Sequence, residues 1–421
     1  MIRNDADLIV VGGGAAGLYA AAIAARRGLR VLILEKCPRP ARKLMITGKG
    51  RCNVTNNTTK EKLMENIPCN PKFLYSAFAS CDAQDVMRFF EAQGVELKTE
   101  RGNRVFPVSD KAVDIVDALV GACKTAGAKL LTDTPVQSLV IEDGVLTGVK
   151  TENGACYTAP NVLVTCGGLS YPTTGSTGDG YRLARQAGHT IKECRGSLVA
   201  LESNEPLCLN AMGLSLRNVT LCCEERGKKK NKVVYKEQGE MLFTHFGVTG
   251  PLVLSASAHI RKDPKDYTLI LDLKPALSAE QLDARILRDF LKYVNKDVVN
   301  ALDELLPKKI ISDIIRLAGI DPQTKVHDLT KEQRLSLVHT IKNVVIPVSA
   351  FRPVKEAIVT NGGVNVKEIN PHTMESKLLG GLYFAGEVID VDAYTGGFNL
   401  QIAFATGNLA AISVNKDGSV E

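Results

Sequence analysis

The architecture of this chain is set by Asp7–Glu35, which reads DLIVVGGGAAGLYAAAIAARRGLRVLILE. Its opening apolar run predicts a buried strand, its Ala-rich centre predicts a helix, and its closing apolar run predicts a second strand that ends in Glu35. The glycines between the first strand and the helix, Gly12, Gly14 and Gly17, match the GxGxxG pattern. The stretch therefore predicts a complete βαβ unit with a dinucleotide-binding turn.

Each glycine of the motif has a separate physical role. Gly12 permits the tight turn, Gly14 lets the backbone approach a diphosphate, and Gly17 lets the helix pack closely on the strand. The free N–H groups at the helix start stabilise phosphate charge. Glu35 is placed to accept hydrogen bonds from a ribose diol, which favours FAD or NAD over NADP.

Composition indicates a soluble globular protein of two or three domains, with 421 residues, 45% of them hydrophobic and 23% charged. The apolar runs are too short for a membrane helix, and the N-terminal stretch is too short for the apolar core of a signal peptide. We therefore expect a cytoplasmic protein without membrane association. The net charge of +6 suits an anionic cofactor or substrate but does not by itself indicate nucleic acid.

The eleven cysteines are odd in number and include no CxxC pair, which is typical of reduced thiols rather than of a disulfide framework. The six histidines show no HxxxH spacing, so we expect no zinc site and no other metal centre.

Only one GxGxxG fingerprint is present. A second strand that ends in glycines is predicted in residues 161–181, NVLVTCGGLSYPTTGSTGDGY, and alternating apolar residues over 130–154 predict a β-meander. Near the C-terminus, Gly396–Gln401 (GGFNLQ) places paired glycines directly before a helical pattern. Such a bare helix start indicates that a ligand approaches the backbone there.

This order of elements resembles the glutathione-reductase-type FAD fold, in which the first βαβ unit holds the ADP half of FAD. In that fold the chain returns late with an apolar strand and an acid that bonds the ribityl chain; here the match is YFAGE, with Glu387, and Asp390 and Asp392 are nearby alternatives. The resemblance also implies that the backbone N–H groups of Gly397, Phe398 and Asn399 face the flavin C2 carbonyl.

Three further stretches narrow the resemblance: Arg42–Asn56 (RKLMITGKGRCNVTN), Gly239–Pro251 (GEMLFTHFGVTGP) and Asp390–Gly407 (DVDAYTGGFNLQIAFATG). They are similar to signatures of the BaiN/YhiN-like NAD(P)/FAD-dependent oxidoreductases, also described as aminoacetone-oxidase-like flavoproteins. The resemblance spans residues 7–412. It implies an α/β fold, a glutathione-reductase-type FAD-binding Rossmann domain with an inserted β-rich domain and a small helical domain.

The resemblance implies an FAD-dependent enzyme that transfers hydride through flavin N5. The first expectation is NAD(P)H-dependent reduction of an activated C=C bond in an enone-like small molecule of the dehydro-bile-acid type, with NADH or NADPH binding transiently. The alternatives are a ribosomal RNA dihydrouridine synthase, for which RNA is the partner, and an FAD-dependent amine oxidase. A flavin-bearing binding protein without turnover is a further alternative. The sequence leaves the oligomeric state open.

The resemblance also implies a set of cofactor-binding residues. These are Gly12, Gly14, Ala15, Ala16, Gly17, Glu35, Lys36, Lys43, Gly50, Arg51, Cys52, Asn53, Val136, Cys166, Gly167, Gly168, Gly386, Glu387, Asp390, Gly397, Phe398, Asn399 and Leu400.

Reduction of a conjugated C=C bond needs a proton donor near the flavin, and four residues are candidates. Cys52 lies beside the basic Lys49 and Arg51, which we expect to lower its pKa; packing beneath the ring is its other interpretation. Tyr171 and Tyr394 flank the predicted flavin strands, and packing or hydrogen bonding is their alternative role. His245, between apolar residues, is either structural or on the substrate side.

Two groups of basic residues stand out. Arg42, Lys43, Lys49 and Arg51 are expected to contact the cofactor phosphate or an anionic substrate, with solvated loop charge as the alternative. The run Arg226, Lys228, Lys229, Lys230 and Lys232 predicts a soluble hairpin turn, or else a phosphate-backbone contact that would suit RNA.

Along the chain, residues 1–194 and 346–421 are expected to form a discontinuous FAD-binding domain. Residues 195–277 alternate in the manner of strands and predict an inserted β-rich domain, and 278–345 predict a small helical domain. Ser278 with Gln281 and Thr330 with Gln333 are capping-box pairs that predict two helix starts.

Overall fold

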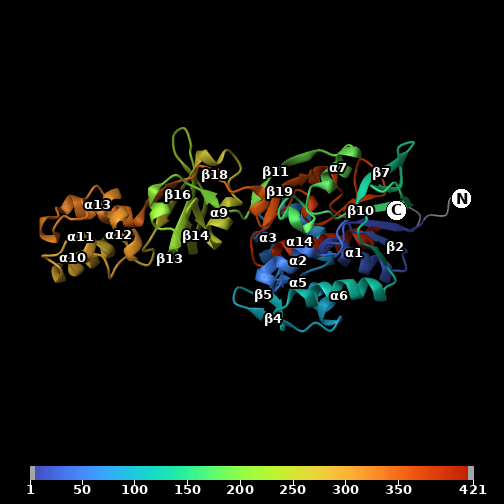
Figure 1. Cartoon of the computed structure of the whole chain (residues 1–421), viewed down its shortest axis with the longest axis horizontal. Helices are drawn as coiled ribbons and strands as arrows, with labels where there is room; N and C mark the ends of the chain where they lie inside the picture. The colour runs from blue at the N-terminus through green and yellow to red at the C-terminus, as the bar shows by residue number, and fades with distance from the viewer. Residues whose placement is uncertain (1–4, 416–421) are drawn as a thin grey trace. The chain divides into compact units, whose positions relative to one another are not determined.

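The computed structural model describes residues 5–415 and divides the chain into two compact units (Figure 1). The first unit combines the segment up to Ser197 with the segment from Val354 onward, and the second comprises Leu198–Pro353. Parallel and antiparallel sheets are both present, so the predicted mixed α/β class with a Rossmann core is confirmed. The division into three domains stays a prediction.

The core of the first unit is a five-stranded parallel sheet of order β20-β10-β1-β2-β6. Its central strands are fully buried apolar runs, as both faces of a parallel sheet are covered. The predicted first strand, helix and second strand are all present. The bounds are β1 Leu8–Val11, α1 Ala15–Arg26, β2 Val31–Leu34, β6 Lys129–Leu131, β10 Asn161–Val164 and β20 Leu382–Phe384.

Smaller sheets and helices surround this core. The predicted meander is present as an antiparallel sheet, but it begins later than expected, because residues 129–131 pair with β2 in the parallel sheet instead. The sheets are β7 Val136–Glu142, β8 Val145–Thr151 and β9 Cys156–Thr158; β3 Thr55–Asn56, β5 Arg104–Pro107 and β4 Leu97–Glu100; and β11 Ile191–Ser197 with β19 Val359–Val364. The helices are α2 Arg42–Ile46, α3 Lys60–Glu65, α4 Tyr75–Ser80, α5 Ala83–Glu91, α6 Ala112–Thr125, α7 Asp179–Gln186 and α14 Phe398–Ser413.

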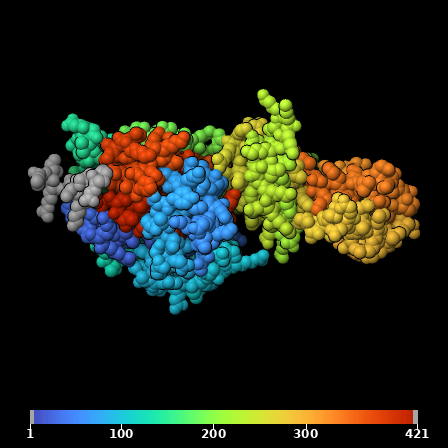
Figure 2. Space-filling model, turned by 180° about the vertical axis from the view of Figure 1, so that it is seen from behind, coloured from blue at the N-terminus to red at the C-terminus, as the bar shows by residue number. Residues whose placement is uncertain are grey.

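The two ends of the chain meet where α1 packs on α14, and Figure 2 shows the blue and red segments side by side. Glycine permits this contact, because a Cβ atom on Gly407 would lie 2.7 Å from the Ala16 carbonyl oxygen. A Cβ atom on Gly17 would lie only 2.0 Å from the Gly12 carbonyl oxygen. Both helices therefore approach their neighbours at backbone distance.

The second unit has one seven-stranded sheet, of order β17-β16-β13-β14-β15-β12-β18, and a set of helices. One hydrophobic cluster joins them, since it contains Leu271 from β16, Ile314 from α12 and Leu337 from α13. The strands are β12 Leu201–Glu202, β13 Ser215–Glu225, β14 Lys232–Thr244, β15 Gly247–Thr249, β16 Tyr267–Asp272, β17 Val344–Pro347 and β18 Ala350–Phe351. The helices are α8 Pro206–Asn210, α9 Pro251–Ser257, α10 Ala279–Lys292, α11 Val298–Ala301, α12 Lys308–Leu317 and α13 Lys331–Lys342.

Both predicted capping boxes are present. Ser278 caps α10 with Gln281, and Thr330 caps α13 with Gln333, so each pair satisfies free N–H groups at a helix start. The basic run also lies where the pattern placed it, as the exposed turn between β13 and β14. Within residues 5–415, no helix has the length and apolar character that crossing a bilayer requires.

We expect Gly17→Ala to lower the free energy of unfolding by about 1–3 kcal/mol, because the added methyl group overlaps the Gly12 carbonyl oxygen. Gly121→Ala is the matched control. Gly121 lies within α6 and a Cβ atom there meets no atom within 4 Å, so alanine should stabilise the helix by up to about 1 kcal/mol. Urea denaturation followed by circular dichroism measures the free energy of unfolding of both variants. Equal denaturation midpoints for the two variants would contradict the packing argument.

Candidate functional site

A cavity of about 1030 Å³ lies within the first unit, at the carboxyl ends of its parallel strands. The residues that follow β1, β2, β10 and β20 all line it: Gly12, Glu35, Thr165 with Cys166, and Gly386 with Glu387. Ligands of open α/β sheets bind in the crevice outside these strand ends. The cavity is therefore the candidate functional site.

The helices α1 and α14 both begin at the wall of this cavity, and neither start is capped by a side chain. Gly14 precedes α1 and Gly397 precedes α14, and both helices lack an acidic residue in the first turn. The positive ends of two helix dipoles are thus presented to one cavity. Gly397 has φ +97°, and a Cβ atom there would lie 2.3 Å from the Thr55 carbonyl, so only glycine fits this start.

Most of the predicted cofactor residues line the cavity. They are Gly12, Gly14, Ala15, Ala16, Glu35, Lys36, Lys43, Arg51, Asn53, Val136, Cys166, Gly167, Gly386, Glu387, Gly397, Asn399 and Leu400. The other predicted residues lie outside its lining, namely Gly17, Gly50, Cys52, Gly168, Asp390 and Phe398.

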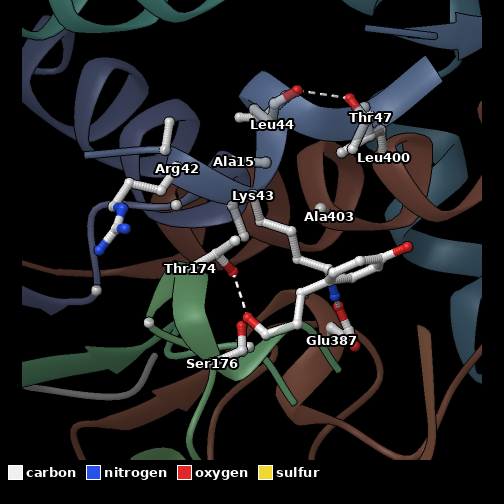
Figure 3. A pocket seen from close by; sticks show the side chains of 18 of the residues that line it. Ala15, Arg42, Lys43, Leu44, Thr47, Thr174, Ser176, Glu387, Leu400 and Ala403 are labelled. Carbon is white, nitrogen blue, oxygen red and sulfur yellow. Dashed lines mark hydrogen bonds and ion pairs between the residues drawn. The ribbon is translucent and has the colours of Figure 1, made fainter. Parts of the chain in front are cut away.

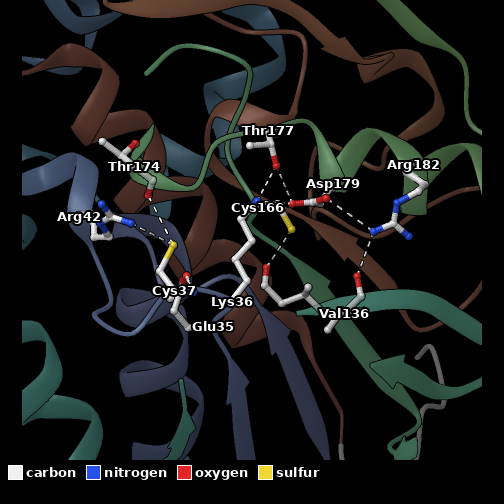
Figure 4. A network of polar contacts seen from close by, with 12 residues as sticks. Glu35, Lys36, Cys37, Arg42, Val136, Cys166, Thr174, Thr177, Asp179 and Arg182 are labelled. Carbon is white, nitrogen blue, oxygen red and sulfur yellow. Dashed lines mark hydrogen bonds and ion pairs between the residues drawn. The ribbon is translucent and has the colours of Figure 1, made fainter. Parts of the chain in front are cut away.

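At one end of the cavity, Glu35 follows β2 and holds the glycine turn. Its carboxylate accepts hydrogen bonds from the backbone N–H groups of Gly13, at 2.7 Å, and Cys37, at 2.8 Å. Beside it, Lys36 Nζ lies 2.5 Å from both Thr177 Oγ1 and Asp179 Oδ2 (Figure 4). This polar network joins the end of β2 to the loop before α7. Repeated glycines in the 161–181 stretch were the only signal for this loop.

Lys43 of α2 lines the cavity, and its side chain extends to Glu387 (Figure 3). Its Nζ lies 2.6 Å from Glu387 Oε2 and 2.6 Å from Ser170 Oγ, while Glu387 Oε1 accepts from Ser170 Oγ at 2.8 Å and from the Thr360 N–H at 2.9 Å. Of the three late acids, Glu387 is the one in the cavity lining.

The other two acids are engaged elsewhere. Asp390 accepts a hydrogen bond from Asn70 Nδ2 at 3.0 Å, and buried Asp392 bonds Ser197 at 2.5 Å and Asn361 at 2.7 Å. Asp390 and Asp392 therefore hydrogen-bond neighbouring segments of the chain. The spacing of the acids in the sequence does not predict these partners.

The opposite end of the cavity is built around the start of α14. The Asn399 side chain accepts from the Ala393 N–H at 2.9 Å and donates to the Ala393 carbonyl at 2.7 Å, so it holds the loop that carries Tyr394. Asn53 also lines this wall, and its amide oxygen Oδ1 is buried with no hydrogen-bond partner among the described residues. A bound N–H group would satisfy that oxygen.

Two further residues line this end, Arg104 and Phe106 of β5, and neither was predicted from the sequence. Arg51 packs over the Phe106 ring with 4.1 Å between the guanidinium carbon and the ring centre. Arg51 also forms ion pairs with Glu100 and Asp110, both at 2.5 Å. Neither acid nor aromatic ring is near Arg51 in sequence, so no local signal predicted this cluster.

The predicted lowering of the Cys52 pKa is wrong. Cys52 is completely buried, and burial raises the pKa of its thiol to about 12, which a hydrogen bond with Thr47 offsets only in part. Its basic neighbour Arg51 faces Glu100 and Asp110 instead. Cys52 has φ +59°, so it fills a tightly turned position outside the cavity lining.

The remaining catalytic candidates differ in location. Tyr171 and Tyr394 both line the cavity. His245 belongs to the second unit, where it is exposed in the turn between β14 and β15 and its ring centre lies 5.0 Å from that of Phe246.

We expect Cys52 to resist alkylation by iodoacetamide in the folded protein below pH 9, because its thiolate fraction rises only as the pH approaches 12. Exposed Cys156 serves as the internal control and should react first. Peptide mapping by mass spectrometry measures both sites, and labelling of Cys52 at the rate of Cys156 at pH 8 would contradict the prediction.

The family model "HI0933-like protein Rossmann domain" matches residues 6–413. The chain is 30% identical to the 3-dehydro-bile acid delta(4,6)-reductase of Clostridium scindens, over 95% of this chain and 97% of that protein. It is also 31% identical to the ribosomal RNA dihydrouridine synthase of Haemophilus influenzae, over 97% and 98% of the two chains.

Among solved structures, the 3-ketosteroid delta1-dehydrogenase of Sterolibacterium denitrificans shares the fold, with a TM-score of 0.54 and 14% identity over 98% of this chain and 99% of that chain. The match to the family model and to full-length relatives confirms the resemblance on which the sequence analysis relied. The chain therefore belongs to the HI0933-like Rossmann family, a family of FAD-dependent oxidoreductases.

Proposed function

We propose that the protein reduces a C=C bond conjugated to a carbonyl group, in an enone-like small molecule, with electrons from NADH or NADPH. The observation that carries the proposal is the pair of uncapped helix starts at one cavity, α1 for a diphosphate and α14 for a ring that gains negative charge on reduction. Two relatives with different substrates support it, because a bile-acid delta(4,6)-reductase and a dihydrouridine synthase are both named for reduction of such a bond.

The residues of the cavity fit FAD. Seven basic side chains line it against four acidic ones, an excess that suits a diphosphate. Gly12 to Ala16 would hold the diphosphate, Glu35 the adenosine ribose, Glu387 the ribityl hydroxyls, and Gly397 to Asn399 the ring. The buried Asn53 Oδ1 supplies an acceptor for an N–H group. Bound FAD would supply a hydride to the electrophilic carbon of the substrate.

The protein must then deliver a proton to the neighbouring carbon. We assign this role to Tyr394, because it lines the cavity three residues before Gly397, where α14 begins. Tyr171 also lines the cavity but leads into the loop beside Cys37 and Lys36, where a Cβ atom on Gly175 would lie 3.0 Å from Cys37 Sγ. Tyr394 is therefore the better-placed donor, and the Asn399 side chain positions its loop.

A specific observation favours a second substrate, a uracil base in RNA. The exposed turn between β13 and β14 carries Arg226, Lys228, Lys229 and Lys230, and the exposed Lys232 begins β14. Figure 2 shows this yellow-green turn projecting from its unit. Clustered cations of this kind bind phosphate backbones. The bond reduced would again be conjugated to a carbonyl, so the two candidates differ in substrate rather than in chemistry.

Anaerobic half-reactions test the proposal. The FAD-bound protein is mixed with NADH or NADPH, and the reduced protein is then mixed with a 3-oxo-4-ene steroid, uridine-containing RNA or oxygen. We expect a reduced nicotinamide to bleach the flavin absorbance and the steroid to restore it fastest. Fastest recovery with RNA would favour the second candidate. Hydrogen peroxide released with an amine, and no recovery with either C=C substrate, would overturn the proposal in favour of an amine oxidase.

We expect Tyr394→Phe to slow reoxidation by the C=C substrate by about 100-fold and to leave reduction by the nicotinamide unchanged, because only the substrate step needs a proton donor. Stopped-flow absorbance measures both half-reactions. Tyr75→Phe is the matched control, since Tyr75 is exposed on α4 away from the cavity. Slow reoxidation in Tyr171→Phe with normal reoxidation in Tyr394→Phe would refute the assignment.

A further inference from the structure

We propose that Lys49 and Arg104 form a binding site for an anionic group of the substrate, a carboxylate or a phosphate, at the end of the cavity where α14 begins. This inference rests on the proposed function and adds to it a class of substrate. Arg104 was not among the residues that sequence analysis selected, and the role of Lys49 was left open between cofactor, substrate and solvent.

Short-range contacts place Arg104 beside the start of α14. Arg104 pairs with Asn56 in the register of β5 and β3, and Asn56 Nδ2 donates to the Gly396 carbonyl at 3.0 Å. Gly397 packs on Thr55 of β3, where a Cβ atom on Gly397 would lie 2.3 Å from the Thr55 carbonyl. An anion held here would lie at the ring end of the cavity, away from the Gly12 turn.

The charges of Lys49 and Arg104 remain available for a ligand. Both side chains line the cavity, and neither forms an ion pair with any residue in the described range. The hydrogen bond recorded for the Arg104 side chain is from Nε to the Arg101 carbonyl, at 3.1 Å, which leaves the outer nitrogens of its guanidinium to bind an anion.

Two of the other cations in the group Arg42, Lys43, Lys49 and Arg51 are paired with protein acids. Arg51 bonds Glu100 and Asp110, and Lys43 bonds Glu387. Arg42 and Lys49 form no ion pair within the described residues. Arg42 instead donates to Cys37 Sγ at 3.7 Å, beside the end of β2, so Lys49 is the unpaired cation of the loop that carries Arg51.

The loop that carries Lys49 and the strand that carries Arg104 share contacts with the ring of Phe106. A Cβ atom on Gly48 would lie 3.2 Å from Phe106 Cε1, so the turn before Lys49 rests on that ring. The guanidinium carbons of Arg51 and Arg104 lie 4.1 and 6.0 Å from the centre of the same ring. Lys49 itself has φ +60°, a left-handed conformation that a lysine adopts only where its surroundings impose it.

Such a site would orient the substrate as well as attract it. An anion bound at a fixed distance from the start of α14 restricts how the reactive C=C bond lies at the ring, which is how remote binding energy promotes a reaction. The proposed site therefore predicts discrimination between charged and neutral forms of one substrate.

The test uses the FAD-bound protein and two matched pairs of probes: a 3-oxo-4-ene bile acid with its uncharged methyl ester, and uridine 5′-monophosphate with uridine. For whichever pair is turned over, we expect Lys49→Gln with Arg104→Gln to raise the KM of the anionic probe about tenfold or more. The KM of the neutral probe should not change, and the preference for the anion should weaken as salt is added to the wild type. Arg101→Gln is the matched control, because Arg101 is exposed and lies outside the cavity lining.

The two half-reactions identify the source of the anion. If the variant slows reduction by NADH or NADPH and leaves reoxidation unchanged, the cations serve the phosphates of the electron donor and the inference is overturned. Equal KM changes for the charged and neutral probes would overturn it as well. Failure of the proposed function gives a separate result, since no C=C probe would then reoxidise the wild-type protein.

Discussion

The cavity depends on the close backbone contacts that α1 and α14 make with their neighbours. Gly407 lets α14 rest against the Ala16 carbonyl, and Gly17 lets α1 rest against the Gly12 turn. The contact between Gly407 and Ala16 joins residues 391 positions apart (407 − 16), so it packs the C-terminal helix on the N-terminal βαβ unit. Larger side chains at these glycines would separate the helices, and the cavity would lose one of its walls.

The helices α10 and α13 begin differently from α1 and α14. In the second unit, α10 and α13 satisfy their first N–H groups with capping boxes. In the first unit, α1 and α14 begin at glycines without side-chain caps and direct those groups toward the cavity. The free N–H groups are a cost to helix stability that a bound anion or a reduced flavin ring repays. Two such starts at one cavity are the clearest physical sign of the cofactor.

Charge in the cavity is controlled by pairing. Glu387 is held by Lys43, Ser170 and the Thr360 N–H, which keeps its carboxylate directed into the lining. Arg51 is neutralised by two acids, whereas Lys49 and Arg104 are not. Cations that are paired with acids stabilise the folded chain, whereas unpaired cations in the cavity lining can bind an anionic ligand.

Local pattern was enough to predict the βαβ unit, the meander, both capping boxes and the basic hairpin turn. Each of these depends on residues close together in the chain, where periodicity, glycine geometry and capping act over a few positions. The same reasoning failed for Cys52, because two basic neighbours in sequence indicated a low pKa while burial raises it to about 12. It also could not find Arg104, which reaches the site only through the pairing of β5 with β3.

The amino-acid order alone thus established the fold class, the dinucleotide turn at Gly12 to Gly17 and the glycine-led helix near the C-terminus. Only the folded chain shows that Glu387 lines the cavity while Asp390 and Asp392 do not, that Cys52 is buried, and that Lys49 and Arg104 form no ion pair within the described residues. The reason is that ion pairing and desolvation depend on which distant residues become neighbours, as when Lys43 meets Glu387 across 344 positions of the chain.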